Sequence, residues 1–173
     1  MKIINKIIAF CVLLMWMVAI GIGCNCSDKT DSEQKKYIRL PEFEYTAPDG
    51  RTIDHNPFYN GVGIISFVAS WCGPCIFELK QLDSLSRSND KIYILAVSYE
   101  PPEFYKSIFD SLNINIPLAG VDSTFFKMCE VKNLPTRILV DNGKIIARVA
   151  GAPTPPDSLF ESALEKLVSE NSK

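Results

Sequence analysis

Two cysteines in the short stretch Trp71-Cys-Gly-Pro-Cys75 are the residues of this chain best suited to chemistry. A pair with this spacing can be a structural disulfide, half of a zinc site, or a dithiol that is reversibly oxidised. A zinc site needs four ligands, and outside the pair only Cys26, His55 and Cys129 remain, with no second pair of matching spacing. The spacing therefore favours a disulfide, either redox-active or structural, and a metal assay would test the zinc alternative.

The dithiol is expected where a buried strand runs into a helix. The stretch from Val62 to Val68 is almost entirely apolar, which is typical of a strand buried on both faces of a parallel sheet. Apolar residues then recur every three positions from Ile76 to Leu85, and Pro74 fits the first turn of a helix. At the N-terminus of that helix, unpaired N–H groups and the helix dipole favour a thiolate. We therefore expect Cys72 to attack a partner's disulfide and Cys75, one turn deeper, to resolve the mixed disulfide.

Glu78 is the acid that the local sequence places beside the dithiol. It follows Cys75 by three residues and so shares its helix face. Cys75 must lose a proton before it can resolve a mixed disulfide, and a nearby carboxylate can accept that proton. In the alternative interpretation, Glu78 only complements the dipole in the first turns of the helix.

Further strands are predicted on both sides of this unit. The run Lys91 to Ser98 is a second buried strand, which completes a strand–helix–strand crossover of about 30 residues. Thr136–Asp141 and Lys144–Val149 flank Asn142-Gly143, the strongest short signal for a β-hairpin. An additional hairpin is expected over residues 37–53, with its turn at 49–50.

Helices are expected in the remaining patterned segments. The predicted ranges are 103–112, with Phe104, Ile108 and Leu112 on its buried face, 122–130, capped at Asp122-Ser123, and 159–168. Together the patterns predict an α/β domain, a mixed central sheet with helices on both faces.

The first 36 residues differ from the rest of the chain of 173. Lys2 and Lys6 precede an apolar run from Ile7 to Ile22, as in an export signal, and an uncleaved membrane anchor is the alternative. The segment ending at Cys24 resembles a bacterial lipobox, whose cysteine is lipidated and becomes the new N-terminus. We expect a lipoprotein signal peptide at 1–23, a flexible polar tether at 24–36 and one domain at 37–173.

Charge and cysteine content limit the remaining function classes. Without residues 1–23, which contain two lysines and no acid, the net charge falls from −2 to −4, so no nucleic-acid partner is expected. Of the six cysteines, Cys129 lies beside two phenylalanines and is expected to be a buried, inert thiol. No cofactor is expected.

Phe67 to Cys75 resembles the thioredoxin superfamily, because the Cys-x-x-Cys pair follows a buried strand, opens a helix and is preceded by Trp71. Leu134-Pro135-Thr136, ahead of the last hairpin, is similar to the cis-proline loop of that fold. Three features are closer to the TlpA/ResA-like thiol–disulfide oxidoreductases of the bacterial cell envelope. They are the N-terminal hairpin, the inserted helical segment before Pro135, and the spacing from Cys72 through Cys75 to Glu78.

This resemblance implies a thioredoxin-like fold, a redox-active Cys72–Cys75 disulfide and a periplasm-facing location. It also implies a substrate-binding surface, formed by Trp71, Gly73, Pro74, Leu134, Pro135 and Thr136. Protein disulfides or dithiols are the implied substrates, with an unidentified electron donor in the envelope and a lipid at Cys24 as the membrane anchor. The Gly-Pro pair between the cysteines also occurs in thioredoxin, which favours a reductant.

Two alternatives share the fold. A peroxiredoxin is expected to have Pro and Thr where Ile65 and Ala69 stand, so we set that alternative aside. The other is a tethered binding protein whose disulfide is only structural, and it would not cycle with dithiothreitol at a potential above about −300 mV.

Overall fold

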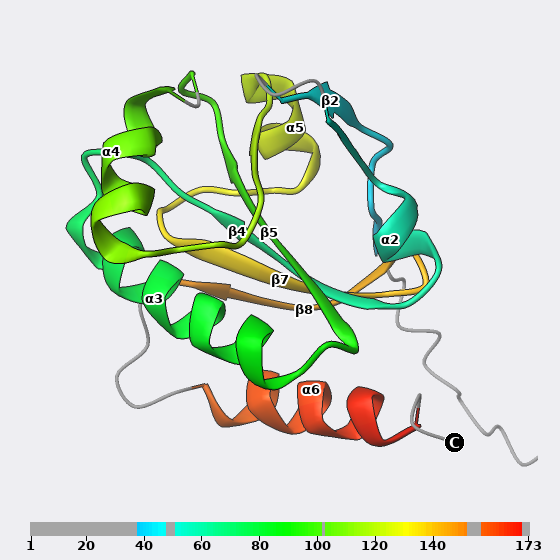
Figure 1. Ribbon diagram of the computed structural model, residues 1–173. Helices are drawn as coiled ribbons and strands as arrows, with labels where there is room; N and C mark the ends of the chain where they lie inside the picture. The colour runs from blue at the N-terminus through cyan, green and yellow to red at the C-terminus, as the bar shows by residue number, and fades with distance from the viewer. Residues whose placement is uncertain (1–37, 48–50, 102, 152–156, 171–173) are drawn as a thin grey trace, which may run out of the picture. The chain divides into compact units, whose positions relative to one another are not determined.

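Six strands form the central sheet of this computed structural model, which describes residues 38–47, 51–101, 103–151 and 157–170 (Figure 1). The strands are β1 (Ile38–Arg39), β4 (Val62–Phe67), β5 (Ile92–Ser98), β6 (Leu118–Gly120), β7 (Thr136–Asp141) and β8 (Lys144–Ala150). Their order across the sheet is β1-β8-β7-β4-β5-β6. β4, β5 and β6 run parallel, whereas β7 is antiparallel to β4 and β8, and β1 is antiparallel to β8. The predicted mixed sheet is therefore confirmed.

Helices cover both faces of the sheet, as predicted. One face packs against α3 (Gly73–Ser88), α4 (Glu103–Leu112) and α6 (Ser158–Glu170). The other face packs against α2 (Asn56–Tyr59), α5 (Ser123–Met128) and the two-stranded sheet of β2 (Glu44–Thr46) and β3 (Thr52–Asp54). Side chains of β4 alternate between these faces, so Ile64 joins the core under α3 and Ile65 the core on the opposite side. Because both faces are covered, the strand is apolar along its whole length.

The Asn142-Gly143 turn joins β7 to β8, as the sequence predicts. Both residues have positive φ, 46° and 77°, which is the backbone that a two-residue hairpin turn of type I′ requires. The amide of Gly143 donates to the carbonyl of Phe58 at 2.8 Å, and the amide of Leu40 donates to the carbonyl of Gly143 at 2.9 Å. The turn therefore ties α2 and the segment after β1 to the end of the sheet.

The N-terminal hairpin is shorter than predicted. Only Glu44–Thr46 and Thr52–Asp54 pair with each other, while Ile38–Arg39 pairs with β8 at the edge of the central sheet. The start of the segment can bond to the exposed edge of β8, which satisfies more backbone groups than a long isolated hairpin would. Two short elements, β6 and α2, were not predicted, because three or four residues are too few to show a period.

The buried face of α4 also differs from the prediction. Phe104 is 59% exposed, whereas Tyr105 is 1% exposed and packs in the core under α3. The Tyr105 hydroxyl donates to Glu100 Oε2 and accepts from the Ser98 hydroxyl, each at 2.9 Å, so the ring can be buried with its polar atom satisfied.

Several predictions concern residues outside the described ranges. These are the signal peptide at 1–23, lipidation at Cys24, the tether at 24–36 and the turn at 49–50. Within the ranges that are described, none of the helices has the length and apolar character needed to span a bilayer.

Candidate active site

Cys72 is the N-cap of α3, and Gly73 and Pro74 form the start of the first turn. The Cys72 backbone is extended, with φ −89° and ψ 94°, so its side chain turns back over the helix end. There its Sγ accepts a hydrogen bond from the backbone N–H of Cys75 at 3.3 Å. The same N–H would face a thiolate on Cys72, and the N-terminal end of the helix dipole favours negative charge at that point.

The sulfur atoms of Cys72 and Cys75 are bonded to each other. Cys75 is fully buried and Cys72 is 5% exposed, whereas Trp71 beside them is 68% exposed. Gly73 and Pro74 are also exposed. The less buried side of the disulfide is therefore that of Cys72, next to the exposed Trp71.

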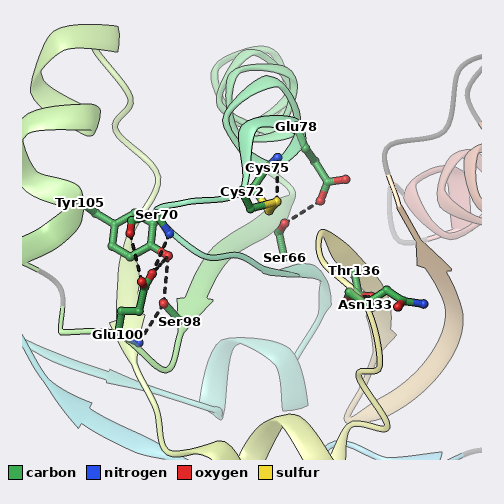
Figure 2. Close-up of a disulfide and its surroundings, with 10 residues drawn as sticks. All are labelled: Ser66, Ser70, Cys72, Cys75, Glu78, Ser98, Glu100, Tyr105, Asn133 and Thr136. Atoms are coloured by element: carbon green, nitrogen blue, oxygen red, sulfur yellow. Dashed lines mark hydrogen bonds between the residues drawn. A yellow bond between two sulfur atoms is a disulfide. The ribbon is translucent and has the colours of Figure 1, made fainter.

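Glu78 is buried behind the disulfide, on the first turns of α3, with 1% of its surface exposed. Its Oε1 accepts a 2.6 Å hydrogen bond from the Ser66 hydroxyl on β4, while Oε2 is buried with no hydrogen-bond partner among the described residues. Figure 2 shows this carboxylate directed from the helix toward Ser66, next to the disulfide. A residue that only complemented the helix dipole would lie at the surface, so its burial argues against that interpretation.

Burial raises the pKa of Glu78 above the ordinary carboxyl value, while the Ser66 hydrogen bond and the positive charge of Arg137 act in the opposite direction. A carboxyl group whose pKa lies closer to neutrality is a better proton acceptor at neutral pH.

The predicted proline loop has the expected geometry. The Leu134–Pro135 peptide bond is cis. Thr136 is buried at the start of β7, its hydroxyl donates to the Asn133 carbonyl at 2.7 Å, and it lies across from Phe67 in the sheet. Leu134 packs against the core that contains both cysteines. The Pro135 carbonyl accepts from the Gly151 amide at 2.7 Å, which joins the loop to the residue that follows β8.

A second polar cluster, around Glu100, was missed by the sequence analysis. Glu100 accepts from the Ser70 amide at 2.6 Å, from the Ser70 hydroxyl at 3.0 Å and from the Tyr105 hydroxyl at 2.9 Å. Its own amide donates to Ser98 Oγ at 3.0 Å. In Figure 2 this cluster and the Glu78–Ser66 contact lie on either side of the disulfide. The cluster therefore anchors the loop that carries Trp71 and Cys72.

A signal for Glu100 was present in the sequence. It follows β5 by two residues, and the carboxyl ends of adjacent parallel strands meet at one edge of a sheet. A polar residue just after β5 was therefore a candidate neighbour of the segment just after β4. Burial alone would raise the pKa of Glu100, but its hydrogen bonds outweigh that effect and hold the pKa below the ordinary value.

Two other residues with reactive side chains lie elsewhere. Cys129 is a free, fully buried thiol, as predicted, and burial raises its pKa to about 12. The Nδ1 atom of His55 lies 2.9 Å from the Phe43 carbonyl, so this histidine is part of the N-terminal segment. Over the described ranges, no group of three or more His, Cys, Asp and Glu side chains is arranged to hold a metal ion.

Comparisons with known proteins agree with this geometry. The family model described as the AhpC/TSA family matches residues 38–156, more than half of the chain. Thioredoxin-1 of Saccharomyces cerevisiae is 29% identical over 89 residues, which are 51% of this chain and 67% of the yeast protein.

Solved structures have the same fold. A thiol-disulfide oxidoreductase from Bacteroides fragilis is 27% identical, with a TM-score of 0.57 over 71% of this chain and 98% of its own. A thioredoxin-family thiol:disulfide interchange protein from Chlorobium tepidum is 16% identical, with a TM-score of 0.64 over 76% of this chain and 97% of its own, which supports the fold alone. The chain therefore belongs to the AhpC/TSA family and is a thiol–disulfide oxidoreductase with a thioredoxin-like fold.

Proposed function

We propose that the chain reduces protein disulfides in the bacterial cell envelope through the Cys72–Cys75 pair. The observation that carries the proposal is the hydrogen bond from the Cys75 amide to Cys72 Sγ at the start of α3. This contact favours the thiolate of Cys72, which is 5% exposed, over that of the fully buried Cys75.

The reaction proceeds in two steps. The Cys72 thiolate attacks one sulfur of a substrate disulfide, which forms a mixed disulfide and releases the other substrate sulfur as a thiolate. Cys75 then gives its proton to Glu78 and attacks Cys72 Sγ, which releases the second substrate thiolate. The substrate gains two electrons, and the chain is left with the Cys72–Cys75 disulfide. An envelope dithiol, the electron donor, must then reduce this disulfide.

Glu78 is the proton acceptor in this scheme. It lies one helical turn beyond Cys75, is held by Ser66, and has one carboxylate oxygen with no hydrogen-bond partner among the described residues. Ser66 carries no basic group, so its part is to hold the carboxylate in place.

Substrate contacts are assigned to the surface around the exposed edge of the disulfide. Trp71, Gly73 and Pro74 are exposed on one side of it, and Leu134, Pro135 and Thr136 form the cis-proline loop. A loop of this kind can bind an extended substrate segment mainly through backbone hydrogen bonds, which gives affinity for many sequences. Reduction, rather than oxidation, is favoured by the Gly-Pro pair between the cysteines and by the likeness to thioredoxin.

The proposed location in the cell envelope is inferred from the first 36 residues. A signal peptide at 1–23 directs export, Cys24 receives a lipid that anchors the chain in the membrane, and residues 24–36 tether the domain on the periplasmic side. Mass spectrometry of the native protein should find a lipidated N-terminus at Cys24, and an intact Met1 would contradict this assignment.

The function is tested by trapping. Cys75→Ser removes the resolving thiol, so it should accumulate mixed disulfides between Cys72 and envelope proteins, which mass spectrometry can identify. The matched control, Cys72→Ser, should trap none. The proposal fails if Cys72–Cys75 is not reduced by dithiothreitol at potentials above about −300 mV, because the disulfide would then be structural. Rapid consumption of hydrogen peroxide by the reduced protein would instead indicate peroxiredoxin chemistry.

A further inference from the structure

Two buried polar atoms without a hydrogen-bond partner among the described residues lie on the α3 face of the sheet. One is Oε2 of Glu78, and the other is Nε of Arg137 on β7. The two residues are 1% and 6% exposed. An isolated buried charge is costly, so a buried carboxylate and a buried guanidinium on one face of one sheet require an explanation.

The sheet register places the two groups close together. Ser66 on β4 pairs directly with Arg137 on β7, and Ser66 is the residue that holds Glu78. Side chains directly opposite each other in an antiparallel pair point to the same face, with Cβ atoms about 4.5–5.5 Å apart. Arg137 therefore extends beneath the helices from the position next to the hydroxyl that holds the carboxylate.

Two residues of α6 hold the guanidinium. It lies over the ring of Phe160, 4.6 Å from the ring centre, and its Nη2 is 3.3 Å from Oε1 of Glu161. The Glu161 side chain is 42% exposed, so it neutralises the buried cation only in part. Arg137 thus keeps positive charge inside the core, on the face of the sheet that α6 covers.

We propose that Arg137 is a positioning residue for Glu78, and that its buried positive charge keeps the Glu78 carboxylate ionised and able to accept the Cys75 proton. It acts through space, since Glu78 Oε2 accepts no hydrogen bond from a described residue. Guanidinium is always protonated in proteins, so the charge it supplies is constant across the working pH range. The proposal rests on the proposed role of Glu78, but its physical part can be measured separately.

We compared the charges of the described groups around Glu78, and Arg137 is the principal source of positive charge among them. β4 contributes the neutral Ser66, and α6 contributes Glu161, which opposes the effect of Arg137. The residues that neighbouring strands place in this core are uncharged: Ile94 and Ala96 from β5, and Ala147 and Val149 from β8. α3 itself also carries the dithiol, the exposed Lys80, and the buried Asp83, which is ion-paired with Arg87 at 2.7 Å. The Tyr105 side chain of α4 lies in the same core. Removing Arg137 and removing Glu161 should therefore have opposite effects on Glu78.

The direct test follows the Glu78 carboxyl group by NMR in oxidised protein labelled with ¹³C at the glutamate carboxyl, with the signal assigned by its loss in Glu78→Gln. Wild-type Glu78 should be ionised at neutral pH. In Arg137→Met the titration of Glu78 should move to higher pH, in Arg137→Lys it should move less, and in Glu161→Gln it should move to lower pH. A purely structural role of Arg137 would not produce opposite shifts.

The matched control is Arg148→Met. Arg148 lies on the adjacent strand β8 and pairs with Ile138, whose side chain belongs to the opposite core. The Arg148→Met variant should leave the Glu78 titration unchanged. The proposal is overturned if wild-type Glu78 is protonated at neutral pH, a measurement that needs no variant, or if Arg137→Met and Arg148→Met move its titration equally.

Kinetics separate this proposal from the proposed function. When reduced protein reacts with one equivalent of 5,5′-dithiobis(2-nitrobenzoate), the first coloured thiolate reports attack by Cys72 and the second reports resolution by Cys75. Since a positioned base contributes about 10²–10⁴-fold, Arg137→Met should slow the second phase by about tenfold near pH 7, with recovery at higher pH. If Glu78→Gln leaves that phase unchanged, the proposed role of Glu78 fails, while the NMR titration still decides whether Arg137 controls its charge.

Discussion

The hydroxyl of Ser66 donates a 2.6 Å hydrogen bond to the carboxylate of Glu78, across the boundary between the central strand and the helix that carries the dithiol. The two residues are twelve positions apart, and both are buried. A carboxylate in this place cannot exchange its partner for water, so its ionisation is coupled to the stability of the fold.

That coupling predicts an unusual pH dependence for the oxidised protein, in which the two cysteines do not titrate. The pKa of Glu78 is raised in the folded state, mainly by burial, so the folded state binds the proton more tightly than the unfolded state does. The stability that this provides is fully present below the ordinary carboxyl pKa and is lost as the pH rises through the folded-state value.

Urea unfolding of the oxidised protein from pH 4 to 8 measures this effect. The difference in unfolding free energy between wild type and Glu78→Gln should shift in favour of the variant as the pH rises, because glutamine carries no charge at any pH. Parallel curves for the two proteins would mean that burial does not perturb this carboxyl group.

Glu100 should stabilise the fold with the opposite dependence on pH. Glu100→Gln replaces one acceptor oxygen by an amide group and leaves a donor of Ser70 or Tyr105 without its acceptor, at a cost of about 1–3 kcal/mol. The pKa of Glu100 is lowered, so this stabilisation is present above the ordinary carboxyl pKa and is lost as the pH falls through the folded-state value.

Urea unfolding at pH 7 and at pH 3.5 checks the prediction for Glu100. Glu165→Gln, on the exposed side of α6, is the control and should change stability by less than about 0.5 kcal/mol. If Glu100→Gln lowered the unfolding free energy equally at both pH values, the negative charge of Glu100 would not be what stabilises the loop.

Gly63 on β4 is predicted to tolerate no side chain. A Cβ there would lie 2.4 Å from the fully buried ring of Phe58 and 2.9 Å from the Tyr93 carbonyl, so Gly63→Ala should destabilise by about 1–3 kcal/mol or more. At Gly73 a Cβ would meet no atom within 4 Å, so Gly73→Ala is the matched control, with thermal unfolding as the measurement. Equal melting temperatures for the two variants would contradict the packing around Phe58.

Alkylation should reveal which thiol attacks first. Iodoacetamide added to the reduced protein near neutral pH is expected to modify Cys72 before Cys75, because Cys72 Sγ faces the Cys75 amide and Cys75 is fully buried. Peptide mass spectrometry after short reaction times gives the order. Preferential labelling of Cys75 would reverse the roles assigned to the two cysteines.

Local patterns were sufficient to predict the part of the site that lies on consecutive residues. The strand follows from a continuous apolar run, the helix start at Cys72 from Pro74 and the apolar repeat after it, and the helix face shared by Cys75 and Glu78 from the helical period. The Asn-Gly hairpin is equally local, and the structure has each of these elements at or within one residue of the predicted position.

Contacts between distant segments could not be predicted in this way. Glu100 meets Ser70 across 30 residues, and only the pairing of β4 with β5 brings them together. The choice of Tyr105 over Phe104 for the core depends on the hydrogen-bond partners of the Tyr105 hydroxyl, Ser98 and Glu100, which the helical period does not predict. Arg137 could be singled out in the sequence as a charged residue within an otherwise apolar strand. Its placement on the same face of the sheet as Glu78 follows only from the sheet register.

The most direct test of the account is the two-phase reaction of reduced Glu78→Gln with one equivalent of 5,5′-dithiobis(2-nitrobenzoate), compared with wild type from pH 6 to 10. Attack by Cys72, the first phase, should change little. Resolution by Cys75, the second phase, should slow by about 10²–10⁴-fold near pH 7 and recover in alkali, where the thiol ionises without a base. If both phases keep their wild-type rates and pH profiles, Glu78 does not accept the Cys75 proton.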